Sequence, residues 1–256
     1  MTILRVAAKT HVGRVRTENQ DCLLLDAWIS ARDGAYARNH TLRAGEAPYV
    51  AAVCDGMGGH AGGSVASRLA AASLGSRPWP GIDSEVVIEQ VGAAARAIRT
   101  VSDDVHGLRG LGSTVAGVAV TATRFSVFSV GDSAVFRIAE GSVGELTVPD
   151  RRPDPHRAGA MVLTQSLSMF TSCPDPAVET YPIVRPVRLL ICSDGLTDVV
   201  APDVLRSLLS GPVGRAGEAE RAVTDLIAAA LGNNAPDNVS VIVVDLVPSE
   251  PAGPVR

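Results

Sequence analysis

Aspartates recur where apolar runs of this sequence start or end, and most of them stand next to glycine or asparagine. They are Asp21 in TENQD, Asp55 in VAAVCDG, Asp132 in VGDS, Asp194 in CSDG and Asp237 in APDN. A single aspartate of this kind is typical of a turn, because its side chain can satisfy local backbone donors. Aspartates at corresponding ends of several strands would instead meet at one rim, where their repulsion favours bound cations or protonation.

Carboxylate ligands without histidine or cysteine favour the hard ions Mg²⁺ and Mn²⁺ over zinc. The glycine-rich stretch YVAAVCDGMGGHAGG, residues 49–63, has a second possible interpretation as a phosphate-cradling loop. A dinucleotide fold would then need an acidic residue closing a second strand about 20 residues later. The sequence has the turn GSRPWPGID there, followed by a helical segment, so we favour the metal site.

The elements that must position these aspartates are short apolar runs rich in valine and isoleucine, which predict strands. The runs are 3–8, 22–29, 49–54, 115–122, 124–130, 133–139, 187–192 and 239–246. Too few residues join 115–122 to 124–130 for a helical crossover, which indicates antiparallel pairing. Helical periodicity appears at 64–75 after a Ser64 cap and at 84–104, 202–210 and 217–231. Helix pairs between groups of strands predict an α+β fold with helices outside packed antiparallel sheets.

Two stretches without periodicity, 30–47 and 149–186, are rich in proline, glycine and arginine and are interpreted as surface loops. The second is long enough to be a functional flap. Residues 1–246 are expected to form one domain, and residues 247–256 a disordered tail.

Composition excludes several classes of function. The formal net charge of −4 gives no basic footprint for nucleic acid, and no apolar segment approaches the ~20 residues that span a bilayer. The N-terminal residues lack a signal-peptide core, and the cysteines form no CxxC pair, which predicts a cytoplasmic protein. Cys54 and Cys192 end apolar runs and are expected to be buried.

Several motifs together resemble a known family. They are GRVRTENQD at 13–21, VCDGMGGHAGGSVAS at 53–67, LGSTVAGV at 111–118, VGDS at 130–133, CSDGLTD at 192–198 and PDNVSVIVV at 236–244. In this order they are similar to the motifs of bacterial metal-dependent serine/threonine protein phosphatases of the type 2C kind, the PPM family. The resemblance covers residues 5–246. It implies a four-layer α/β/β/α sandwich in which two antiparallel sheets pack face to face with helix pairs outside.

The resemblance also implies ligands for two Mn²⁺ or Mg²⁺ ions. Asp55, Asp194 and Asp237 would hold the first ion. Asp55, the Gly56 carbonyl and water would hold the second, with Asp21 steering its hydration shell. The implied reaction is direct attack on phosphorus by a metal-bridging hydroxide, without a phosphoenzyme.

Further roles follow from the same resemblance. Asp132 with Asp194 would make a third, weaker metal site, and Arg16 would bind the substrate phosphate. His60 has two open interpretations: it could protonate the leaving alkoxide, or it could have a structural role. Gln20 stands where many relatives carry glutamate, and Ala134 where arginine is frequent. The segment between Asp132 and Asp194 is short, without the usual helical flap pattern, so substrate selection there is not inherited.

The implied function is an active phosphatase in signal transduction. Its substrates would be phosphoserine and phosphothreonine proteins made by a serine/threonine kinase, and the chain is expected to be a monomer. Two alternatives stay open: a pseudophosphatase that serves as a regulatory binding module, or a phosphatase of an anti-sigma-factor antagonist or a small phosphorylated metabolite.

Overall fold

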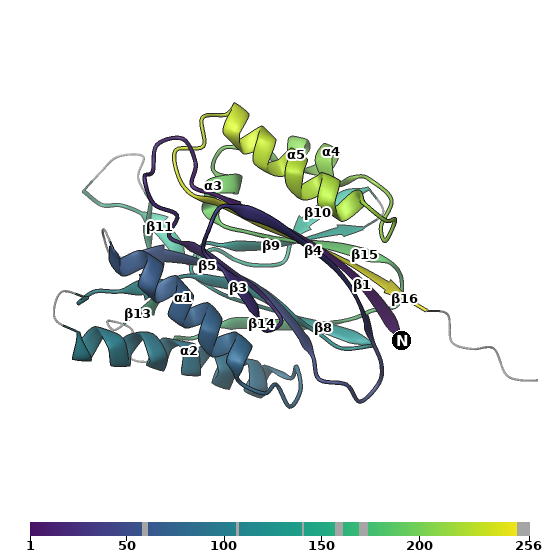
Figure 1. Cartoon of the computed structure of the whole chain (residues 1–256), viewed down its shortest axis with the longest axis horizontal. Helices are drawn as coiled ribbons and strands as arrows, with labels where there is room; N and C mark the ends of the chain where they lie inside the picture. The colour runs from purple at the N-terminus through teal and green to yellow at the C-terminus, as the bar shows by residue number, and fades with distance from the viewer. Residues whose placement is uncertain (58–60, 106–107, 140, 157–160, 169–173, 250–256) are drawn as a thin grey trace, which may run out of the picture.

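Two antiparallel sheets pack face to face, and helices cover the outer face of each (Figure 1). A computed structural model describes residues 1–57, 61–105, 108–139, 141–156, 161–168 and 174–249. The alternation of strand runs and helix pairs along the sequence thus produces the predicted α+β sandwich of four layers. One buried apolar cluster lies between the sheets, and one lies between each sheet and its helices.

The first sheet has the strand order β10-β9-β15-β16-β1-β4. Its strands are β1 (Thr2–His11), β4 (Gly34–Leu42), β9 (Ala134–Ala139), β10 (Ser142–Glu145), β15 (Val187–Cys192) and β16 (Val239–Pro248). Helices α3 (Asp194–Thr197), α4 (Pro202–Leu209) and α5 (Glu218–Gly232) cover it. The periodicity predicted α4 and α5 closely, whereas the single turn of α3 is too short to show a period.

The second sheet has the order β13-β6-β5-β7-β8-β14, with β2 paired to β5 and β3 to β2. Its strands are β2 (Asp21–Leu25), β3 (Trp28–Ser30), β5 (Tyr49–Met57), β6 (Gly112–Ser113), β7 (Val115–Val120), β8 (Arg124–Val130), β13 (Leu167–Ser168) and β14 (Ala177–Pro182). β7 and β8 pair antiparallel, as their short connection predicted. Helices α1 (Ala61–Ser76) and α2 (Ser84–Asp104) lie against this sheet.

The helical periodicity predicted at 84–104 is confirmed by α2. Val87, Val91, Ala94 and Ile98 are buried in the cluster that joins α1 and α2 to the second sheet. The predicted Ser64 cap is wrong, because α1 begins at Ala61 and Ser64 lies inside the helix. The polar run of small residues and glycines before Val65 carries no apolar period, so the sequence placed the start of the helix too late.

The interpretation of residues 30–47 and 149–186 as loops is wrong in part. The first contains β4, an edge strand whose side chains are largely exposed and which pairs only with β1. The second contains β13, β14 and a hairpin of β11 (Arg151–Pro153) and β12 (Met161–Leu163). Exposed edge strands and three-residue strands bury too little to need alternating apolar residues, so the pattern misses them. The predicted strand 22–29 is divided by a turn at Asp26, where φ is +58°.

The final strand β16 continues to Pro248, so part of the predicted tail 247–256 is strand. Residues 250–256 lie outside the described residues. Cys22, Cys54 and Cys192 are buried free thiols, which confirms the expectation for Cys54 and Cys192. None of the described helices is both long and apolar enough to cross a membrane.

Candidate active site

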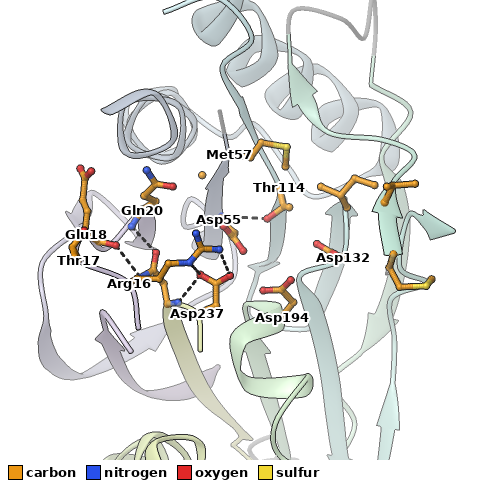
Figure 2. Close-up of a pocket in the computed structure, with 15 residues that line it drawn as sticks. Arg16, Thr17, Glu18, Gln20, Asp55, Met57, Thr114, Asp132, Asp194 and Asp237 are labelled. Carbon is orange, nitrogen blue, oxygen red and sulfur yellow. Dashed lines mark hydrogen bonds and ion pairs between the residues drawn. The ribbon is translucent and has the colours of Figure 1, made fainter. Parts of the chain in front are cut away.

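A cavity of about 930 Å³ opens at one rim of the sandwich. Figure 2 shows four of the predicted carboxylates around it. They are Asp55, Asp132, Asp194 and Asp237. Arg16 and Gly56 line the same cavity. The structure therefore brings together six of the predicted site residues, although they are far apart in the chain.

Strand pairing explains why these aspartates meet. Asp55 lies near the end of β5, Asp194 follows β15, and Asp237 precedes β16, the antiparallel neighbour of β15. Asp132 lies where the chain passes from β8 in the second sheet to β9 in the first. In antiparallel sheets the end of one strand adjoins the start of the next, so these positions share one rim.

Asp21 lies directly opposite Asp55 across the pair β2 and β5. Its side chain is fully buried, and its Oδ2 accepts a hydrogen bond of 2.9 Å from Ser193 Oγ. Oδ1 is buried without a hydrogen-bond partner among the described residues. Burial raises the pKa of Asp21 to about 6. Asp21 therefore does not line the cavity but lies next to it, across from Asp55 on the neighbouring strand. One of its two buried carboxylate oxygens accepts no hydrogen bond from the described residues.

The carboxylates of the cavity suppress one another's ionisation. Burial, followed by the charges of Asp21 and Asp194, raises the pKa of Asp55 well above its usual range. Burial and the charge of Asp132 raise the pKa of Asp194 to about 7. Burial also raises the pKa of Asp132, although Arg151 opposes this. Close carboxylates that resist ionisation need a compensating cation or shared protons.

The possible ligands fit hard divalent ions, because the cavity is lined by carboxylates. The nearby Asp21 adds a buried oxygen that has no hydrogen-bond partner among the described residues. As the side chains stand, no three aspartate, glutamate, histidine or cysteine groups of the described chain are placed to hold one ion. The predicted ligand assignments, including the third site at Asp132 and Asp194, therefore stay predictions.

Arg16 forms a two-pronged ion pair with Asp237. Arg16 Nε donates to Oδ1 at 2.9 Å, and Nη2 donates to Oδ2 at 2.7 Å (Figure 2). The hydrogen bond and charge of Asp237 raise the pKa of Arg16, and the charges of Asp55 and Asp194 raise it further. The guanidinium thus lies in the field of the carboxylate rim, and its binding of a substrate phosphate stays a prediction.

Asn238 holds the segment that carries Arg16, a role that the sequence interpretation missed. Its Oδ1 accepts from Gln20 N at 2.8 Å, and its Nδ2 donates to the carbonyls of Val12 and Glu18 at 2.8 and 3.0 Å. One side chain therefore fixes both ends of the Val12–Gln20 loop to the start of β16. The available signal was the PDN sequence, in which the asparagine adjoins a predicted metal ligand.

Thr114 fixes the backbone of Asp55. Asp55 N donates to Thr114 Oγ1 at 3.2 Å, and Thr114 N donates to the Asp55 carbonyl at 2.8 Å. The hydroxyl of Thr114 also shares a 2.7 Å hydrogen bond with Ser133, beside Asp132. Thr114 thus fixes the backbone of Asp55 and links it to the turn that carries Asp132.

Gly56 is required by close packing rather than by an unusual turn. A Cβ at this position would collide with the carbonyl oxygens of Gly63 in α1 and Gln20. Because Gly56 has no side chain, the first turn of α1 at Gly63 can pack directly against the end of β5. Gly58, Gly59 and His60 are outside the described residues, and the role predicted for His60 stays a prediction.

The β11–β12 hairpin forms the wall of the cavity opposite Arg16. Met161, Val162 and Leu163 line the cavity, and Arg151 pairs with Asp198 at 3.4 Å. Residues before the hairpin are tied to the rim, because Asp150 Oδ2 accepts from Gly131 N at 2.9 Å. The segment between Asp132 and Asp194 thus contains a short hairpin whose second strand lines the cavity, which sequence periodicity did not detect.

The two departures from the family pattern lie in different surroundings. Gln20 lines the cavity, beside the predicted second metal position. Ala134 is 3% exposed and packs in the cluster under α3 to α5, so its small side chain fills core rather than touching a substrate.

The chain is similar to known proteins over most of its length. The family model for protein phosphatase 2C matches residues 35–231. The chain is 29% identical over 264 residues to the serine/threonine protein phosphatase PstP of Mycobacterium tuberculosis strain H37Rv, covering 96% of this chain and 45% of PstP. It is 26% identical to the protein phosphatase PhpP of Streptococcus pneumoniae R6, covering 95% of this chain and 98% of PhpP.

A solved structure is similar over the same range. The crystal structure of the catalytic domain of PstP in complex with two manganese ions superposes with a TM-score of 0.75 at 27% identity, covering 96% of this chain and 100% of that chain. This chain spans less than half the length of full PstP. Because the family model matches well over half of its residues, the chain belongs to the protein phosphatase 2C family.

Proposed function

We propose that the chain is a serine/threonine phosphoprotein phosphatase that hydrolyses phosphomonoesters at a site for two Mn²⁺ or Mg²⁺ ions. The observation that carries the proposal is the single cavity lined by Asp55, Asp132, Asp194 and Asp237, with the guanidinium of Arg16 at its edge. The named activities of PstP and PhpP support it.

Different residues would bind the metal ions and the substrate. Asp55, Asp194, Asp237 and the Gly56 carbonyl would hold the ions, and Asp21 would accept hydrogen bonds from their water. Divalent ions would supply two effects when bound: they lower the pKa of bound water to about 7, and they neutralise charge on phosphoryl oxygens. Arg16 presents a planar fork that matches two phosphoryl oxygens.

The reaction needs no nucleophilic side chain. A water oxygen forms a bond to phosphorus while the ester P–O bond breaks, and the leaving alkoxide takes a proton. His60 is the candidate proton donor from its place in the sequence. The thiols nearest the site, Cys22 and Cys54, are buried, and burial raises their pKa values, so they stay protonated and inert.

A phosphatase assay tests this proposal. Turnover of a phosphothreonine peptide should require Mn²⁺ or Mg²⁺, stop in EDTA and exceed turnover of the phosphotyrosine peptide. Asp194→Asn should lower kcat by roughly a hundredfold or more. The matched control is Asp203→Asn, an exposed aspartate of α4 that pairs with Arg206 away from the cavity.

Two outcomes would contradict the proposal. Turnover that persists in EDTA would exclude the metal site as the catalytic centre. Calorimetry that detects phosphopeptide binding without the slow heat of hydrolysis would favour the regulatory binding module instead.

A further inference from the structure

Arg16 is the only cationic side chain among the described residues that line the cavity. It contacts Asp237, one of the residues assigned to the first ion. Both carboxylate oxygens are engaged, because Oδ1 accepts from Arg16 Nε and from Asn238 N at 2.8 Å, while Oδ2 accepts from Arg16 Nη2. The carboxylate of Asp237 is therefore already paired with a positive charge.

The Arg16 contact and metal coordination compete at Asp237. A divalent ion on this carboxylate would place two positive charges within contact distance, where they repel. In addition, a guanidinium fork that holds a carboxylate cannot present the same donors to a phosphate. Arg16 therefore has two alternative anionic partners, the Asp237 carboxylate and a phosphoryl group, each of which offers two oxygens to the guanidinium.

We propose that Arg16 is an internal counter-ion of Asp237 that is released when a divalent ion binds there, and that this release makes the guanidinium available to the substrate phosphate. The inference rests on the proposed function. Metal binding and phosphate binding then promote each other, because each removes the arrangement that competes with the other.

The surroundings allow this exchange without movement of the backbone. The Arg16 side chain is 56% exposed, so solvent surrounds most of it. The ends of its loop are fixed by Asn238, and Arg14 N donates to the Ala235 carbonyl at 2.9 Å. A rotation of one exposed side chain on a fixed loop is enough to change partners.

Calorimetric titration of the EDTA-stripped, dialysed chain with Mn²⁺ alone tests the inference. Arg16→Gln should bind its tightest Mn²⁺ roughly two- to fivefold more tightly than the wild type, the range expected for loss of one exposed ion pair. Arg14→Gln is the matched control, since it removes a charge from the same loop. Among the described residues its Nε donates to the Leu231 carbonyl and Arg14 pairs with no carboxylate, so its Mn²⁺ affinity should equal the wild type's.

Arg16→Lys separates the contact from net charge. It keeps the positive charge but loses the two-pronged geometry, so its Mn²⁺ affinity should lie between those of the wild type and Arg16→Gln. An affinity equal to the wild type's would mean that charge alone acts, and would overturn the inference. Unchanged or weaker Mn²⁺ binding by Arg16→Gln would overturn it as well.

Two further measurements follow the guanidinium and the coupling directly. The NMR signal of Arg16 Nε–H should shift when Mg²⁺ is added, before any phosphate is present, and a signal that does not move would overturn the inference. Inorganic phosphate should tighten Mn²⁺ binding by the wild type more than by Arg16→Gln.

These measurements distinguish failure of the proposed function from failure of the inference alone. If Mn²⁺ binds no variant, the proposed function fails together with the inference. If Mn²⁺ binds and supports hydrolysis by the wild type, but Arg16→Gln does not change its affinity, only the inference fails.

Discussion

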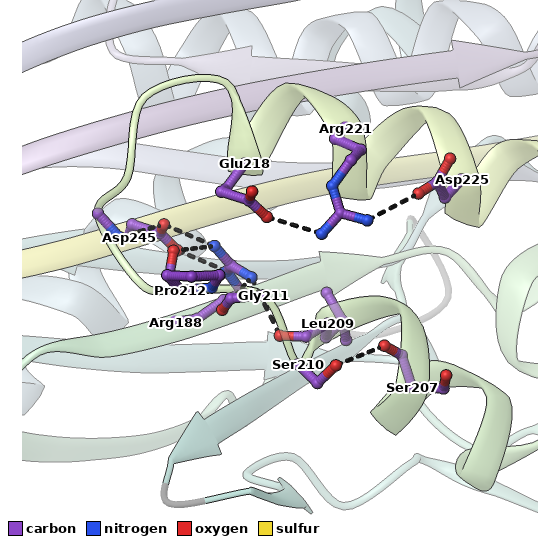
Figure 3. A network of polar contacts seen from close by, with 11 residues as sticks. Arg188, Ser207, Leu209, Ser210, Gly211, Pro212, Glu218, Arg221, Asp225 and Asp245 are labelled. Atoms are coloured by element: carbon purple, nitrogen blue, oxygen red, sulfur yellow. Dashed lines mark hydrogen bonds and ion pairs between the residues drawn. The ribbon is translucent and has the colours of Figure 1, made fainter.

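Arg188 and Asp245 are direct partners across β15 and β16, and both side chains are fully buried. Arg188 Nε and Nη2 donate to the two Asp245 oxygens at 2.7 and 2.8 Å (Figure 3). Arg188 Nη1 also donates to the carbonyls of Leu209 and Gly211, at the end of α4. The pair thus fixes the α4–α5 connection to the first sheet, well along β15 from the cavity.

Removing one partner of this pair should strongly destabilise the fold. Asp245→Asn leaves a buried guanidinium without its counter-charge, which typically costs about 3–5 kcal/mol of unfolding free energy. Urea denaturation would measure this loss. The double variant Arg188→Met with Asp245→Leu should recover much of it, because no unpaired charge stays buried. A single variant as stable as the wild type would contradict this account.

Asn238→Ala should impair the site through the loop that carries Arg16. It removes three hydrogen bonds at the joint between the Val12–Gln20 loop and β16, each worth about 1 kcal/mol. We expect weaker binding of inorganic phosphate and a raised KM for a phosphothreonine peptide. Asn233→Ala is the control, since it removes a hydrogen bond to the Val199 carbonyl away from the cavity.

Gly56→Ala should disrupt the approach of α1 to β5. The added methyl would overlap the Gly63 carbonyl oxygen and lie 2.7 Å from that of Gln20, and backbone on both sides leaves little room to adjust. Differential scanning calorimetry should show a fall in Tm of several degrees, about 2–4 °C for each 1 kcal/mol lost. Gly144→Ala in β10 meets nothing within 4 Å and should leave Tm nearly unchanged.

The stability of the metal-free chain should depend on pH with a defined sign. Burial first, and neighbouring carboxylates second, raise the pKa of Asp194 to about 7, and burial raises that of Asp21 to about 6, from 3.8. The folded state thus binds these protons more tightly than the unfolded state. In EDTA these groups should lower the free energy of unfolding as pH rises from about 4 to about 7.

Urea denaturation at several pH values, with EDTA or Mn²⁺, checks this dependence. The stability gained from Mn²⁺ should increase with pH, because the ion replaces protons on the same carboxylates. Asp194→Asn in EDTA should lose less stability than the wild type between about pH 5 and about pH 7. Equal slopes for the two proteins would contradict the assignment to Asp194.

The sequence predicted the aspartate positions well because strand ends are set by local patterns. Runs of Val, Ile and Leu are buried in the sheets, and the polar residue next to each run lies at the end of a strand, on the rim of the sheet. By contrast, β4 and β14 were missed because edge strands keep one side in solvent and show no alternation. The partner of Arg16 could not be predicted, because that contact depends on how the loop after β1 meets the start of β16.

The segments that pass between the sheets at the cavity rim all contribute residues to it. The β1–β2 loop carries Arg16, the β8–β9 turn carries Asp132, and the path from β10 to β13 carries Met161 to Leu163. Asp55 belongs to the second sheet, whereas Asp194 and Asp237 adjoin strands of the first, so the packing of the two sheets sets the distance between these carboxylates. Substitutions in the core between the sheets, such as Ile191→Val or Val53→Ala, should therefore shift these carboxylates relative to one another.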